Sequence, residues 1–128
     1  MKEFAAVEWQ RALRTLASGT QLVKTDPDSA ASRAYYAAFH ALTAMFALRG
    51  QTFSKHSALR GALHRELIKA GRWDVELGRA YDFLMDMRET GDYGGLVRVK
   101  PIDAEMALDK AKAIIEAVKQ NCPGFEQQ

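Results

Sequence analysis

The segment from Ser29 to Leu48 constrains the fold most, because it carries two apolar stripes at helical spacing. One stripe consists of Ala34, Ala38, Ala41, Met45 and Leu48, and the other of Tyr35, Phe39, Leu42 and Phe46. A helix with two apolar faces is typical of the centre of a bundle, or of a helix that packs into a partner. Its many alanines would let a neighbouring helix approach closely.

Four further segments also have the apolar spacing of helices, with glycine, proline and capping residues between them. They run from about Lys2 to Val23, from Ser54 or Ser57 to Ala70, from Trp73 to about Gly91, and from Asp103 past Val118. The expected N-caps are an aspartate or serine before the Ser29 segment, then Ser54 or Ser57, and Asp103. The sequence therefore predicts an all-α fold, an up-and-down bundle of four or five helices.

The composition predicts one domain over residues 1–122, with a C-terminal tail over residues 123–128. A single cysteine, Cys122, excludes a disulfide framework and a cysteine-ligated zinc site. The three histidines are scattered, so we expect neither a metal nor a cofactor. The N-terminus is mixed and charged, and no segment approaches the ~20 apolar residues of a membrane span. We expect a cytoplasmic protein.

Charge is distributed unevenly along two neighbouring segments. Residues 49–72 contain six basic side chains and one acidic one, whereas residues 74–92 contain six acidic side chains and two basic ones. Two interpretations remain open. The two helices attract each other through solvated faces, or the basic segment is a patch that meets phosphate.

Arg88 continues an apolar stripe formed by Leu77, Tyr81 and Leu84. An arginine keeps its charge, so it must find an acceptor or reach water at the end of the helix. It either ties down the helix C-terminus, where a cation suits the helix dipole, or lies at a cleft ready for a phosphate.

Arg33 and His40 are seven residues apart on one helix face, with Tyr36 between them. The histidine either hydrogen-bonds a neighbouring helix or acts as a general acid or base. His56 follows Lys55 in a sequence that predicts either a plain helix cap or an anion-binding site.

Three motifs together resemble a bacterial and archaeal branch of the HEPN superfamily, whose name stands for higher eukaryotes and prokaryotes nucleotide-binding. They are SRAYYAAFHA at residues 32–41, SKHS at residues 54–57 and RETGDYG at residues 88–94. The resemblance implies a dimerising helical bundle. It also implies a setting of RNA cleavage, toxin–antitoxin pairs or association with a small nucleotidyltransferase protein.

The resemblance implies that active ribonucleases of this superfamily carry an arginine and, after four to six intervening residues, a histidine. Arg88 matches that arginine, whereas Tyr93 occupies the histidine position and Glu89 is the polar residue after the arginine. Tyrosine is a poor general base at neutral pH, although it can donate a proton or hold a phosphate. The motifs give Arg88, Tyr93 and His40 as candidate catalytic residues. They give Arg33, Tyr36, Lys55, His56 and Asp92 as candidate binding residues.

The leading hypothesis is a homodimeric module that binds RNA, a nucleotide or a small nucleotidyltransferase partner, in a toxin–antitoxin-type system. A metal-independent endoribonuclease is the first alternative, in which Arg88 holds the phosphate and His40 or Tyr93 moves the proton. The second alternative is a purely structural helical dimer, in which Arg88 only fixes the turn that follows it.

Overall fold

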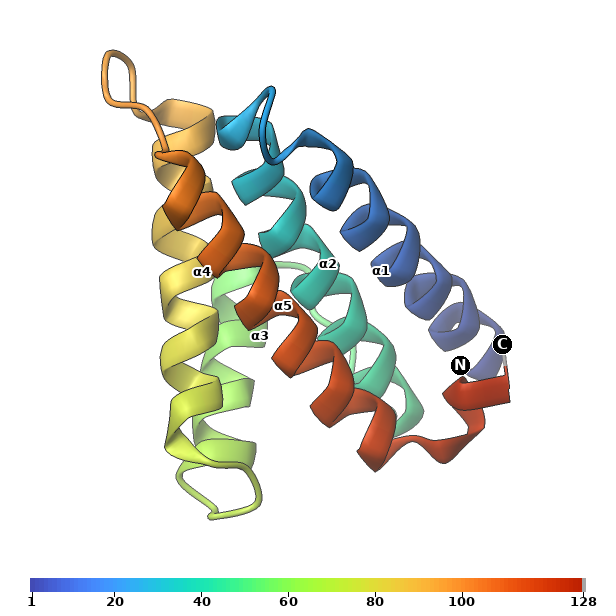
Figure 1. Ribbon diagram of the computed structural model, residues 1–128. Coiled ribbons are helices and arrows are strands. Elements are labelled where there is room, and N and C mark those ends of the chain that lie inside the picture. The colour runs from blue at the N-terminus through green and yellow to red at the C-terminus, as the bar shows by residue number, and fades with distance from the viewer. Residues whose placement is uncertain (128) are drawn as a thin grey trace.

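The computed structural model describes residues 1–127, and these form a helical bundle (Figure 1). Four long helices run alternately up and down: α1 (Lys2–Leu22), α2 (Pro27–Leu48), α4 (Val75–Tyr93) and α5 (Pro101–Asn121). The short α3 (His56–Ala62) continues into a π-helical stretch over Leu63–Ile68, and a 3₁₀ helix spans Pro123–Gln127. Residues 1–127 contain no strand. The predicted all-α bundle is confirmed.

Helix α2 lies at the centre of the bundle, in contact with α1, α4 and α5. Both predicted stripes are buried along most of their length: Ala34, Ala38 and Tyr35 have no exposed surface, although Leu48 at the end is exposed. Helix α1 approaches α2 closely at Gly19, where an added Cβ would lie 3.1 Å from Cβ of Arg33. The two-faced helix is therefore a central one, as its pattern predicts.

Large side chains from every long helix fill the core. Trp9, Tyr35, Phe46, Tyr81 and Ile114 are each 2% exposed or less. Burying a side chain of this size stabilises the fold by about 1.5–3 kcal/mol. The core therefore depends on contacts between helices that are far apart in sequence.

The segment after α5 also contributes to the core. Of the predicted tail over residues 123–128, Gln128 lies outside the described residues. Phe125 is 5% exposed, and its ring stacks on that of Trp9 with the centroids 4.8 Å apart. The end of the chain thus returns to the first helix (Figure 1).

Helix starts differ from the predicted ones in three places. Asp26 caps α2, which begins at Pro27 rather than Ser29, and its Oδ1 accepts a hydrogen bond from Ser29 N. The predicted caps at Ser54 or Ser57 and at Asp103 are wrong, because Lys55 and Lys100 occupy those positions without a side-chain cap. Helix α5 instead begins with Pro101, which has no N–H to satisfy.

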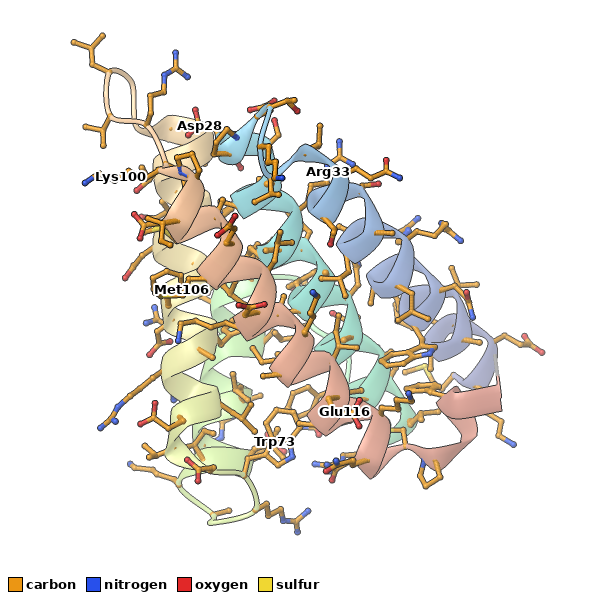
Figure 2. All side chains as sticks on the ribbon, viewed as in Figure 1. Asp28, Arg33, Trp73, Lys100, Met106 and Glu116 are labelled. Carbon is orange, nitrogen blue, oxygen red and sulfur yellow. The ribbon has the colours of Figure 1, made fainter. Side chains whose placement is uncertain are left out.

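The end of α4 packs tightly on the beginning of α2. A Cβ on Gly91 would lie 2.6 Å from the carbonyl oxygen of Asp28, so only glycine fits. The Asp28 carboxylate then accepts hydrogen bonds from Val99 N (2.8 Å) and from Arg98 (3.0 Å), which close the loop between α4 and α5. Figure 2 shows Asp28 near that loop and Trp73 toward the opposite end of α4.

Candidate functional site

Arg88, near the end of α4, reaches across to α2. Its Nη2 donates a hydrogen bond of 2.9 Å to Tyr36 Oη, and its Nε donates to Asp92 at 3.3 Å. The guanidinium carbon lies 5.4 Å from the ring centroid of Tyr35 and 5.3 Å from that of Tyr36. The side chain is 20% exposed. Arg88 is therefore a fixed cation on the border between core and surface.

Asp92 joins the same two helices. Besides the Arg88 contact, its Oδ2 accepts a hydrogen bond of 3.3 Å from the hydroxyl of Ser32 on α2. Ser32, Tyr35 and Tyr36 fall on one side of α2 because helical residues three or four apart are neighbours. The glycine contact at Gly91 brings that side against α4.

His56 begins α3 and lies between aromatic rings of α2. Its ring stacks on Phe39 with the centroids 4.3 Å apart, and its Nδ1 shares a hydrogen bond of 2.7 Å with Tyr35 Oη. Tyr81 Oη donates to Tyr35 Oη at 3.4 Å. Burial lowers the pKa of His56, and the nearby charges of Arg88 and His40 lower it further. His56 is therefore largely neutral at pH 7.

His40 is held by a carboxylate that the sequence analysis missed. Its Nδ1 lies 2.6 Å from Oε2 of Glu8 on α1, a residue that is only 6% exposed. Arg11 is 3.5 Å from the other carboxylate oxygen. A signal for Glu8 existed, because it lies on the apolar stripe of Ala5, Trp9 and Ala12. A carboxylate on such a stripe needs a polar partner from a neighbouring helix.

The aromatic side chains of α2 bring the two histidines and Arg88 into one site. The ring of Tyr36 lies 6.2 Å from that of His40 and 5.9 Å from that of His56, measured between centroids. Phe39 also contacts both histidine rings. We call the group Tyr35, Tyr36, Phe39, His40, His56, Arg88 and Asp92 the Arg88 cluster.

Two predicted site residues lie at the edge of this cluster or outside it. Tyr93 is 72% exposed, and its hydroxyl is 3.5 Å from Nη2 of Arg88. Arg33 is exposed beside Gly19 of α1, so the predicted face shared by Arg33 and His40 points toward α1. Of these two residues, only Tyr93 contacts Arg88.

Lys55 and the basic segment around it face solvent. Lys55 is exposed at the start of α3, as the predicted anion site requires. Farther along, Arg60 Nε and His64 Nε2 lie 2.9 and 3.0 Å from Asp82 of α4. This contact supports the interpretation that the basic and acidic segments attract each other.

An open hollow of about 510 Å³ lies beside Arg88. Its lining consists of Asp86, Arg88, Glu89, Thr90, Tyr93, Gly94 and Val97. Two carboxylates at this hollow disfavour a polyanion there. Within residues 1–127, no three His, Cys, Asp or Glu side chains gather as metal ligands would. The same residues include no helix with the length and apolarity of a membrane span.

Comparison with known proteins gives three matches. A model of the HEPN domain family matches residues 6–121. A UPF0332 protein of Thermotoga maritima is 33% identical over 121 residues, which cover 93% of this chain and 92% of that protein. A protein of Methanocaldococcus jannaschii named "Putative toxin MJ0142" is 30% identical over 93 residues, which cover 73% of this chain and 63% of that protein.

Proposed function

Because the chain belongs to the HEPN domain family, we propose that it binds RNA through a phosphate held at Arg88. The observation that carries this proposal is the fixed guanidinium on the border between core and surface, with Tyr36 on α2 and Asp92 on α4 as its partners. A cation that is already ordered loses little side-chain entropy when a ligand arrives. Arginine is also suited to bidentate contacts with phosphate oxygens.

Arg88 retains donors for such a ligand. Its hydrogen bonds to described residues start from Nε and Nη2, and none starts from Nη1. A guanidinium has five N–H groups in a planar fork, so both N–H groups of Nη1 remain available to a phosphate oxygen. The two carboxylates at the hollow favour approach from the side of His40 and His56 instead. The half-buried rings of Tyr36 and Phe39 on that side suit a nucleobase.

A toxin-type role is part of the same proposal, because one relative carries the word toxin in its name. We also propose a homodimer, with a small nucleotidyltransferase protein as the alternative partner. Apolar side chains in the loop between α4 and α5 support a protein contact at this end of the bundle, since Leu96 is 101% and Val97 64% exposed. Light scattering of the purified chain tests the dimer, and Leu96→Asp should shift it toward the monomer. A monomeric wild type would exclude the dimer.

Fluorescence anisotropy with a short labelled single-stranded RNA tests the binding proposal. Affinity should fall steeply between about 50 and 200 mM salt, because phosphate contacts release counterions. Arg88→Gln should weaken binding about tenfold or more, which corresponds to about 1.4 kcal/mol. Arg79→Gln is the matched control, because Arg79 is an exposed arginine of the same helix that pairs with Glu76. Absent binding at low salt, or equal binding by Arg88→Gln, would exclude the proposed site.

A further inference from the structure

The basic segment formed by α3 and the π-helical stretch has two different faces. On one of them, Arg60 and His64 both hydrogen-bond to Asp82 of α4. Ile68 continues this row of side chains, because its Cγ1 would lie 3.1 Å from a Cβ on Gly78 of α4. The pairing of the basic and acidic segments therefore uses the cations of one row only.

A second row on the same segment faces away from the bundle. The buried residues Leu59, Leu63 and Leu67 are four apart, as are the residues that face α4. In the π-helical stretch Lys69 N donates to the carbonyl oxygen of His64, five residues earlier, and this wider turn keeps residues four apart nearly in line. The outward row has the same spacing and consists of Ser57, Gly61, Arg65 and Lys69.

The outward face carries cations that acidic side chains do not match. The ammonium groups of Lys55 and Lys69 are exposed and have no ion-pair partner among residues 1–127. The Arg65 side chain is 68% exposed, and it shares its partner at 3.4 Å, Glu66, with two hydrogen bonds from Gln51. Solvated cations in such excess attract a polyanion. We call Lys55, Arg65 and Lys69 the basic row.

The basic row begins beside the Arg88 cluster. Its first member, Lys55, directly precedes His56, whose ring is 5.9 Å from that of Tyr36, measured between centroids. The same Tyr36 ring lies 5.3 Å from the guanidinium carbon of Arg88. One aromatic ring therefore separates the start of the basic row from the proposed phosphate site.

The basic row is long enough for several nucleotides. From Lys55 to Lys69 a helix rises roughly 20 Å, at about 1.5 Å per residue. About six nucleotides of one strand cover this length, at about 3.4 Å per nucleotide. Nη1 of Arg65 would lie 3.9 Å from a Cβ on Gly61, so the guanidinium extends back along the helix toward the middle of the row.

We propose that the basic row binds the phosphates of a single-stranded RNA whose next nucleotide lies at Arg88. This inference rests on the proposed binding of RNA at the Arg88 cluster, and it makes the ligand a strand of about six nucleotides or more rather than a free nucleotide. The rings of Tyr36 and Phe39 can stack on a base only when that base is unstacked from its neighbours, which favours a single strand over a duplex. Contacts to phosphates add affinity for the strand without reading its sequence.

The dependence of affinity on RNA length tests the inference. Fluorescence anisotropy at low salt compares labelled single-stranded RNAs of about three and about ten nucleotides. The wild type should bind the longer RNA about tenfold or more tightly, and the combined variant Lys55→Gln, Arg65→Gln, Lys69→Gln should lose most of this difference. In the same variant the slope of log affinity against log salt should become shallower by about two, because each phosphate contact of a single strand contributes about 0.7.

Two further combined variants separate the place of the charges from their number and from the fold. The set Lys2→Gln, Arg14→Gln, Lys112→Gln removes the same charge from exposed positions on α1 and α5, and it should keep the wild-type dependence on length. Exchanging lysine for arginine, and arginine for lysine, throughout the basic row keeps the charge. This variant should keep the wild-type salt slope.

The outcomes distinguish the inference from the proposal on which it rests. Equal affinity of the wild type for both RNAs, or an unchanged length dependence without the basic row, would overturn the inference. The binding proposal would then stand if Arg88→Gln still weakened the binding of both RNAs. An equal loss in the α1 and α5 set would also overturn the inference, because net charge alone would explain it. Tighter binding of a duplex of the same length would overturn the assignment to a single strand, and an absence of RNA binding would overturn both proposals.

Discussion

The hydroxyl of Tyr36 accepts a hydrogen bond of 2.9 Å from Nη2 of Arg88, and this contact joins α2 to α4 beside the candidate phosphate site. The same hydroxyl also limits the rotation of the guanidinium, which the Tyr35 and Tyr36 rings flank. Tyr36 is therefore both a structural link between two helices and part of the surface that would meet a ligand.

Tyr36→Phe should lower the affinity for RNA while keeping the fold. The ring remains, but Arg88 loses the partner that fixes it, so we expect an affinity loss of about tenfold and a stability loss of about 1.5 kcal/mol. Anisotropy and urea unfolding measure the two effects. Tyr93→Phe is the matched control, because the Tyr93 hydroxyl is 3.5 Å from Arg88 and the residue is 72% exposed. Equal effects in both variants would contradict the role assigned to Tyr36.

Gly91→Ala should destabilise the chain by about 1–3 kcal/mol. The added Cβ would lie 2.6 Å from a backbone oxygen of Asp28, so α4 must move away from α2, and the Arg88 contacts move with it. Gly61→Ala in α3 is the matched control. There the nearest atom is 3.9 Å away, at the far end of the Arg65 side chain, and alanine should stabilise the helix by about 0.5–1 kcal/mol. Thermal unfolding measures both variants. Stability changes of the same sign in the two variants would refute the packing argument.

Phe125→Ala should cost about 3 kcal/mol, because the ring is 5% exposed and stacks on Trp9. Phe4→Ala is the control, since Phe4 is 43% exposed and should change stability by less than about 0.5 kcal/mol. Denaturant unfolding compares the two. A negligible effect at Phe125 would mean that the fold ends near residue 122, as the domain prediction has it.

The fold could be predicted largely from one helix. The two stripes of α2 require neighbours on both sides, and the structure supplies α1 on one side and α4 and α5 on others. Arg88 could also be singled out, because a charge that continues the stripe of Tyr81 and Leu84 needs a specific partner. The starts of the helices were harder to predict, because Lys55 and Lys100 precede α3 and α5 without a side-chain cap.

The candidate site could be predicted only in part, because its contacts depend on helix register. His40 and Arg33 share a face of α2, but that face meets α1, and only His40 lies opposite a carboxylate. Glu8 was visible as a polar residue on an apolar stripe, yet nothing in the spacing pairs it with a residue 32 positions away. His56 reaches Tyr35 because the link from residue 49 to residue 55 returns along α2, and that path has no sequence signature.

Stability should fall as the pH drops below about 6.5, the ordinary pKa of histidine, because of His56. Burial, and then the charges of Arg88 and His40, lower the pKa of His56 in the fold. Below pH 6.5 the unfolded chain therefore binds a proton that the folded chain does not, and stability decreases with falling pH. The measurement is the melting temperature between about pH 7.5 and pH 5.5. His56→Gln should show a smaller fall over this range than the wild type. Equal falls in the wild type and His56→Gln would show that another group causes the loss. The two proteins are compared by the change of melting temperature with pH and not by the melting temperature itself. His56→Gln also changes the hydrogen bond with Tyr35, which affects stability at every pH.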